Sequence, residues 1–289
     1  DEVQGFTRSF QEDFGSPDLL FLGTETGLYI TINGGKSWSK FTNNVPATAI
    51  HHMEMHAGTN DLIMGTHGRG VIILDDVSPL RALTPEVLTK DVHFIPADEF
   101  TMVEESNFGG TSSELQFVGP NRNRNAKVIY YLKKRHTFGK MKMALLDQDG
   151  NVVSELSPGK AKGINIVDWD YMMKAPKMAA GKTFTFGGFT SPRAPAGTYK
   201  VVMTKGKETY ETELIVKYDD TSLLTKEERE THTKVTKKLY DLSEDLAYQV
   251  YEMDEMMAFG EKLAESNPAM KKPVDALLSS INELKNKSV

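Results

Sequence analysis

The sequence predicts a mainly β protein with an α-helical C-terminal tail. Up to residue 219, short runs in which apolar and polar residues alternate are separated by turns rich in glycine, a pattern typical of β-strands. After Asp219-Asp220 the spacing of apolar residues changes from two to about 3.6, the period of an amphipathic helix. The chain has 289 residues, which is enough for two or three domains.

The N-terminal stretch contains a repeat with a period near forty residues. Residues 23–38 read as strand, glycine turn, strand, glycine turn and the start of a third strand, and residues 61–74 repeat the order apolar run, Gly-Thr, glycine turn, apolar run. A period of about forty residues with several strands per repeat is typical of the blades of a β-propeller. The first repeat has four short runs and the second has three, so an outer strand must come from elsewhere or leave an exposed edge.

A second β-rich region follows the repeat. Thr84-Pro85-Glu86 predicts a helix start, because threonine can cap a helix and proline is tolerated in its first turn. The polar stretch from about residue 100 to residue 120 is expected to be a linker or an edge strand. About seven short strands then fit an immunoglobulin-like sandwich, with Ile164, Ile166 and Trp169 as candidates for its interior.

Two amphipathic helices are predicted at the C-terminal end. Thr225 and Glu228 form a capping box, and Ser266-Asn267-Pro268 ends the first helix and starts the second. Two interpretations stay open, a hairpin that closes on itself or on the sandwich, and a docking helix for a partner. The apolar stripes of the two helices are Val235, Leu239, Leu242, Leu246, Val250, Met253 and Met257, and then Val274, Leu277, Ile281 and Leu284.

These patterns divide the chain into four predicted parts. They are the last one to two propeller blades at 1–83, an exit helix and linker at 84–112, an immunoglobulin-like sandwich at 113–219 and a helical hairpin at 220–289.

Composition narrows the classes of partner and chemistry. The net charge is −6 and no stripe of lysine and arginine with interleaved aromatic residues occurs, so we expect no nucleic-acid partner. The chain has no cysteine, which excludes disulfides, thiolate metal sites and a cysteine nucleophile. No run of about twenty apolar residues occurs, so we expect no transmembrane segment. We expect no metal and no cofactor.

The turn at residues 31–38 and the region after it resemble a known family. The turn is similar to the Asp-box of BNR-repeat propellers, which occur in sialidases and sortilin-type domains, with asparagine in place of the customary aspartate. Residues 61–86 resemble the closing blade and exit of large bacterial sortilin-like proteins, in which a FlgD-like immunoglobulin module and a helical tail follow. The resemblance implies that most of the propeller lies upstream of Asp1 and that the Asp-box is structural. The Asp-box residues are Thr31, Asn33, Gly35, Ser37 and Trp38.

The candidate binding residues lie on the run 50–56, which is expected to be the innermost strand of the second repeat, and in the glycine turn at residues 67–70. His52 and His56 share a strand face but lie about 13 Å apart, too far to chelate one ion, and His51 is expected on the other face. His67 could approach from the neighbouring strand. Histidines that are packed or line the channel are favoured over a metal site. Arg69 is a candidate for binding a carboxylate or sugar acid, but an ion pair with Asp75 or Asp76 is favoured.

The leading hypothesis is a non-enzymatic interaction or scaffold protein. It would be the C-terminal part of a larger BNR or sortilin-like propeller protein in a bacterial cell-envelope or secreted complex. Its partners would be the upstream propeller part and other envelope or secreted proteins. The resemblance implies an extracytoplasmic location. The alternative is a sialidase-like glycoside hydrolase whose active site lies mostly in upstream blades, because such a site needs an arginine cluster, a nucleophile and an acid that converge, and this chain shows no such set.

Overall fold

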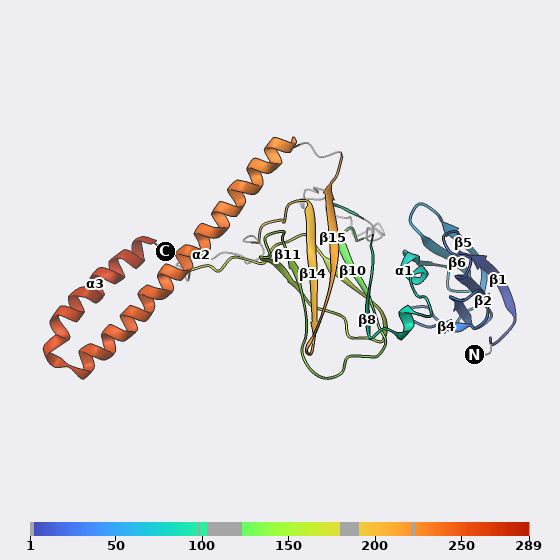
Figure 1. The fold of residues 1–289 in the computed structure, drawn as a ribbon, viewed down its shortest axis with the longest axis horizontal. Coiled ribbons are helices and arrows are strands. Elements are labelled where there is room, and N and C mark those ends of the chain that lie inside the picture. Colours follow the sequence, from blue (N-terminus) through green and yellow to red (C-terminus); the bar gives the residue numbers. More distant parts are fainter. Residues whose placement is uncertain (1–2, 98, 103–122, 180–190, 221–223, 289) are drawn as a thin grey trace. The chain divides into compact units, whose positions relative to one another are not determined.

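The computed structural model describes residues 3–97, 99–102, 123–179, 191–220 and 224–288 (Figure 1). The described residues form a mainly β protein with two C-terminal helices, which confirms the coarse prediction from the sequence. The strands belong to four sheets, and none of the sheets closes on itself within the described part of the chain. The chain divides into two compact units, one of residues 1–97, 128–140 and 158–167 and one of residues 98–127, 141–157 and 168–289.

Residues 7–81 of the first unit form two antiparallel sheets, which we call the two-sheet region. Each predicted run of the repeat is a strand, with the predicted four in the first sheet and three in the second. The first sheet has the order β1-β2-β3-β4, with β1 (Thr7–Glu12), β2 (Leu20–Thr24), β3 (Gly27–Thr31) and β4 (Ser39–Phe41). The second has the order β5-β6-β7, with β5 (Ile50–His56), β6 (Asp61–Thr66) and β7 (Val71–Leu74).

Two short helical turns come after β7. The first is α1 (Ser78–Arg81) and the second is the 3-10 turn η1 (Val87–Thr89). The predicted helix start at Thr84 is only partly right. The Thr84 hydroxyl accepts a hydrogen bond from the Val87 N–H at 3.2 Å, but the helix that follows is the single turn η1, whose N-cap is Glu86.

The remaining strands form a three-stranded and a five-stranded sheet. The three-stranded sheet has the order β13-β10-β8, with β8 (Val92–Ile95), β10 (Ala126–Leu132) and β13 (Gly163–Trp169). The five-stranded sheet has the order β12-β11-β14-β15-β9, with β9 (Phe100–Met102), β11 (Met141–Leu146), β12 (Val152–Leu156), β14 (Gly197–Lys205) and β15 (Glu208–Tyr218). Strands β8 and β9 lie in the stretch predicted as linker, and β9 is an edge strand parallel to β15.

The strand β13 buries a different set of residues from the predicted one. Ile166 is 53% exposed, whereas Asn165, Val167 and Trp169 are buried. The Asn165 side chain bonds to the backbone of the turn that precedes β13, donating to the Ala161 oxygen at 2.8 Å and accepting from the Ala161 N–H at 3.1 Å. These bonds and the buried Trp169 set which face of the strand points inward, so the inward assignment of Ile166 was wrong.

Three buried tyrosines have raised pKa values. Burial raises the pKa of Tyr130 to about 12, and its hydroxyl donates a hydrogen bond to the Gly159 oxygen at 2.6 Å. Burial also raises the pKa of Tyr171 and of Tyr199. A raised pKa means that the unfolded chain loses its tyrosine proton at a lower pH than the folded chain does. The stability that Tyr130 contributes is therefore fully present below pH 10 and is lost as the pH rises from about 10 to 12.

We expect the free energy of unfolding to fall by about 2 kcal/mol across this pH interval because of Tyr130 alone. The measurement is urea unfolding in a pH series, with tyrosinate absorbance as a second observable. The variant Tyr130→Phe should lose this part of the pH dependence. A Tyr130 that ionises near pH 10 in the folded protein would contradict the prediction.

The two C-terminal helices form a hairpin. The long helix α2 (Lys226–Ser266) begins with the predicted capping box, in which the Glu228 N–H donates to the Thr225 hydroxyl and the Thr225 N–H donates to the Glu228 carboxylate. It ends at Ser266, as predicted, and the 3-10 turn η3 (Pro268–Met270) leads into α3 (Lys271–Ser288).

The residues of α3 that pack on α2 differ in part from the predicted stripe. Val274 is buried, and Leu278 and Val274 approach Gly260 so closely that a Cβ there would lie 2.7 Å from Leu278. Leu277 and Leu284 are 59% and 56% exposed, so the predicted stripe was wrong at these two positions. No helix among the described residues is long and apolar enough to cross a membrane.

Candidate functional site

The two sheets of the two-sheet region share one hydrophobic core. Residues that lie on one face of each sheet fill it, and the loop residues Val45 and Val77 close its edges. The core residues in the strands, or directly before β2, are Leu19, Phe21, Leu28, Ile50, Met53, Leu62 and Met64. Each sheet therefore has one inner face on the shared core and one outer face.

The first strands of the two sheets lie close together. The Ser9 hydroxyl of β1 donates to the Ile50 oxygen of β5 at 2.9 Å. Gly23 lies beside this contact, and a Cβ at Gly23 would lie 2.3 Å from the Ser9 hydroxyl and 2.8 Å from the Ile50 oxygen. Only glycine fits here, because any side chain would collide with the neighbouring backbone. The close approach fixes the spacing between the two sheets.

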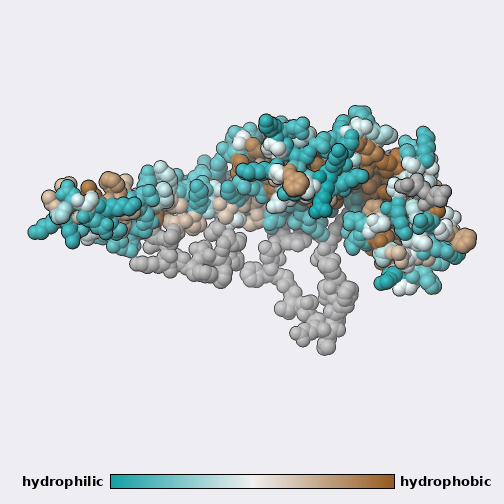
Figure 2. Space-filling model, turned by 90° about the horizontal axis from the view of Figure 1, so that it is seen from below, coloured by the Kyte–Doolittle hydropathy of each residue, from teal (hydrophilic) through white to brown (hydrophobic). Residues whose placement is uncertain are grey.

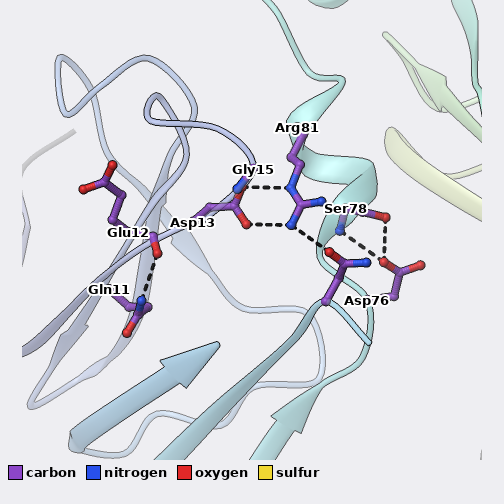
Figure 3. Close-up of polar contacts among 8 residues, drawn as sticks. Gln11, Glu12, Asp13, Gly15, Asp76, Ser78 and Arg81 are labelled. Carbon is purple, nitrogen blue, oxygen red and sulfur yellow. Dashed lines mark hydrogen bonds and ion pairs between the residues drawn. The ribbon is translucent and has the colours of Figure 1, made fainter. Parts of the chain in front are cut away.

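An arginine links three segments of the two-sheet region that are far apart in the sequence (Figure 3). The Arg81 guanidinium donates two hydrogen bonds to the Asp13 carboxylate, at 2.8 Å and 2.9 Å, and a third to the Asn60 side-chain oxygen at 2.9 Å. The Asp13 side chain is fully buried, whereas that of Arg81 is 22% exposed. A Cβ at Gly15 would lie 2.7 Å from the Arg81 Nε, so glycine is also required at this turn.

This link was not found from the sequence. Asp13 and Arg81 are 68 residues apart, and a lone aspartate before a glycine turn or a lone arginine in a short helix is a common pattern. Asp76 lies nearby and accepts hydrogen bonds from the N–H and hydroxyl of Ser78, the first residue of α1 (Figure 3). The hydrogen bonds of Arg81 thus connect α1 to the turn after β1 and to the turn between β5 and β6.

The Asp-box-like turn between β3 and β4 is held by its own side chains. The Thr31 hydroxyl donates to the Asn33 side-chain oxygen at 2.8 Å, and that oxygen also accepts from the Ser37 N–H at 3.0 Å. The Gly35 N–H donates to the Thr31 hydroxyl at 3.1 Å, and the φ of Gly35 is 85°, a value that favours glycine. Trp38 is half-buried beside Gly35. Asparagine therefore accepts the turn hydrogen bonds at the position where the Asp-box has aspartate.

The four candidate histidines do not form one cluster. The rings of His51 and His67 lie 5.7 Å apart, between centroids. A β-bulge between Ile50 and His52 interrupts the alternation of β5, and His51 and His52 are both exposed. His56 contacts the Thr59 hydroxyl through Nδ1 at 2.7 Å. Among the described residues, no three histidine or acidic side chains are placed to hold a metal ion.

Arg69 lies at the tip of the β6–β7 turn. Its neighbours Gly68 and Gly70 have φ values of 76° and 70°. Arg69 is exposed and forms no ion pair with a described residue, and the Asp76 carboxylate is bonded to Ser78 instead. The favoured pairing of Arg69 with Asp75 or Asp76 was therefore wrong. The structure brings His51 and His67 together but does not place Arg69 in an acid-binding cluster with other arginines of the described chain.

Both outer faces of the two-sheet region carry exposed apolar side chains. On the first sheet Phe10 is 56% exposed and is directly opposite Leu22 in the register of β1 and β2. On the second sheet Ile73 is 55% exposed, and its register partner Ile63 is partly buried. Strand β7 pairs with β6 on one side only, so its other edge carries unpaired backbone groups in the described part of the chain.

Comparison of the sequence with family models and with curated proteins, and of the structure with solved structures, found no match.

Proposed function

We propose that the two-sheet region is the end of a larger β-propeller of the BNR type and that the chain is a non-enzymatic interaction or scaffold module. The observation that carries the proposal is the pair of apolar outer faces on a stack of two sheets. In a propeller each blade has apolar side chains on both faces, because each face packs on a neighbouring blade.

The arrangement of the strands supports this interpretation. The first strands of the two sheets, β1 and β5, are neighbours, as the innermost strands of adjacent blades are. Phe10 and Leu22 would then face the preceding blade, and Ile63 and Ile73 would face the next one. The open edge of β7 would accept the outer strand that the second sheet lacks.

The candidate polar residues favour interaction over catalysis. His51 and His67 form an exposed pair at one end of β5, His56 contacts Thr59, and His52 and Arg69 are exposed away from that pair. A sialidase-like reaction needs an arginine cluster together with a nucleophile and an acid. An extracytoplasmic location in an envelope or secreted complex is part of the proposal and depends on the Asp-box resemblance alone.

The experiment measures binding of the full chain to the polypeptide that, on this proposal, the same gene encodes for the preceding blades. We expect binding by calorimetry, and we expect Ile73→Asp to weaken it at least about tenfold, because a charge on the outer face cannot be desolvated against another blade. The matched control is Val152→Asp, which changes an exposed apolar residue of β12, outside the two-sheet region, and should leave binding unchanged.

Two results would contradict the proposal. One is that no such polypeptide is encoded or that it does not bind. The other is release of sugar from sialylated glycans by the bound complex, with loss of this activity in Arg69→Ala, which would establish the hydrolase alternative.

A further inference from the structure

The apolar stripe of α2 continues beyond the part that α3 covers. At 100° per residue Val235, Leu239, Leu242 and Leu246 lie within about 60° of one another, on the same face as Val250 and Gly260. Val250 and Gly260 are buried in the hairpin. In contrast, Val235, Leu239 and Leu242 are 52%, 60% and 52% exposed. We call Val235, Leu239, Leu242 and Leu246 the uncovered stripe. Tan and brown side chains are visible among teal ones along the helices in Figure 2.

Neither α3 nor the described stretch around Lys177, which follows β13, covers this stripe. The ion pair nearest the end of α3 joins Lys285 to Asp254, which is well past the stripe along α2. The Lys177 N–H donates to the Glu244 carboxylate at 3.2 Å. Glu244 lies about 170° around the helix from the centre of the stripe, on its opposite side. Val235, Leu239 and Leu242 therefore form an exposed apolar helix face, and Leu246 at its end is half-buried.

The charges beside the stripe indicate what covers it. Lys234 and Lys238 lie on one flank, and Asp241 and Asp245 lie on the same flank one to two turns later. On the other flank Thr236 and Ser243 are uncharged. Neither Lys238 nor Asp245 forms an ion pair with another described residue. When two copies of α2 run in opposite directions, the basic half of this flank on one copy faces the acidic half of the same flank on the other copy.

We propose that the uncovered stripe binds the same stripe of a second copy of this chain, with the two α2 helices antiparallel. In an antiparallel pair each flank of a helix faces the same flank of its partner, whereas in a parallel pair it faces the opposite flank. Antiparallel pairing puts Lys238 beside Asp245 of the second copy, twice by symmetry. Parallel pairing would instead put Lys238 and Asp245 beside the uncharged Thr236 and Ser243 of the second copy. The charges thus select the antiparallel two-fold arrangement.

The register follows from the stripe. Its spacing of four, three and four residues is that of a helix packing seam. Antiparallel overlap of the four residues places Val235 against Leu246 of the second copy and Leu239 against Leu242 of the second copy. The two-fold axis then crosses the pair midway between the levels of Tyr240 and Asp241 along α2. This dimer is independent of the propeller assignment, because it uses α2 alone.

The first test is sedimentation equilibrium of the full chain at concentrations up to about 1 mM. We expect a monomer–dimer equilibrium whose dissociation constant rises at least about tenfold in Leu239→Asp. The matched control is Phe259→Asp, which changes another exposed apolar residue of α2 outside the stripe and should leave the equilibrium unchanged. A chain that stays monomeric at every concentration overturns the proposal, and so does a dimer that Phe259→Asp disrupts and Leu239→Asp does not.

A charge exchange and a crosslink test the direction of the pair. Lys238→Asp should weaken the dimer, and the double variant Lys238→Asp/Asp245→Lys should restore it. The chain has no cysteine, so single-cysteine variants are unambiguous. A mixture of Val235→Cys and Leu246→Cys should form a mixed disulfide, whereas Val235→Cys alone should not, because its two copies lie about 16 Å apart and a disulfide needs Cα atoms within about 7 Å. Disulfides formed by Val235→Cys alone would show a parallel pair and overturn the proposal.

Discussion

Replacing Arg81 by alanine is expected to lower the free energy of unfolding of the two-sheet region by about 3 kcal/mol. The Asp13 carboxylate is fully buried and accepts two of its hydrogen bonds from Arg81. Without Arg81 the carboxylate retains the bond from the Gly15 N–H, but its charge has lost its ion-pair partner away from water. Hydrogen-exchange mass spectrometry of the full chain measures the effect in β1 and β5, because it reports on each strand separately.

Two controls separate this effect from the loss of an ordinary ion pair. Arg8 pairs with Glu25 at the surface, and its replacement by alanine should cost less than about 1 kcal/mol. The double variant Asp13→Asn/Arg81→Met removes both charges and keeps an acceptor for Gly15, so it should be more stable than Arg81→Ala. If Arg81→Ala costs no more than Arg8→Ala, Arg81 does not hold Asp13 in the folded chain.

The sequence predicts the local elements well because their causes are local. The seven strands of the two-sheet region follow from alternating residues between glycine turns, and the start of α2 follows from Thr225 and Glu228 three residues apart. The turn of Asn33 is equally local, because its hydrogen bonds join residues within four positions of one another. Such features are visible in any window of the sequence that contains them.

The features that could not be predicted depend on residues distant in the sequence. The link between Asp13 and Arg81 requires that the two sheets be stacked, and the pattern at either residue does not contain this information. The same holds for Leu278, which packs on Gly260 because the hairpin brings the small residue opposite to it, whereas the stripe alone favoured Leu277. Neighbouring positions on a helix differ by 100°, so a small rotation of α3 decides which leucine is covered.

The sequence pointed to candidate residues but did not predict the contacts that these residues make. The expectation for His51 assumed a regular strand, whereas β5 has a β-bulge between Ile50 and His52, and His51 and His52 are both exposed. The pairing expected for Arg69 is absent among the described residues, and one oxygen of the Asp76 carboxylate accepts two hydrogen bonds from Ser78 at the start of α1.

Replacing Trp169 by alanine should destabilise the sheets around it by about 3–5 kcal/mol. Trp169 is 1% exposed and belongs to the three-stranded sheet, yet its ring lies 5.0 Å from that of Tyr199 in the five-stranded sheet, with the two rings nearly perpendicular. Its Nε1–H donates to the Met172 oxygen at 2.9 Å, so alanine would remove both packing and a buried hydrogen bond. Hydrogen exchange in β13 and β14 measures the loss.

Ile166 provides the matched control, because it lies on the same strand three residues before Trp169 and is 53% exposed. Ile166→Ala should change the free energy of unfolding by less than about 0.5 kcal/mol. Trp169→Phe keeps an aromatic ring but not the N–H, so it should fall between the two, by an amount that separates the hydrogen bond from the packing. If Ile166→Ala and Trp169→Ala lower the free energy of unfolding equally, the packing of Trp169 against Tyr199 does not stabilise β13, and the prediction is wrong.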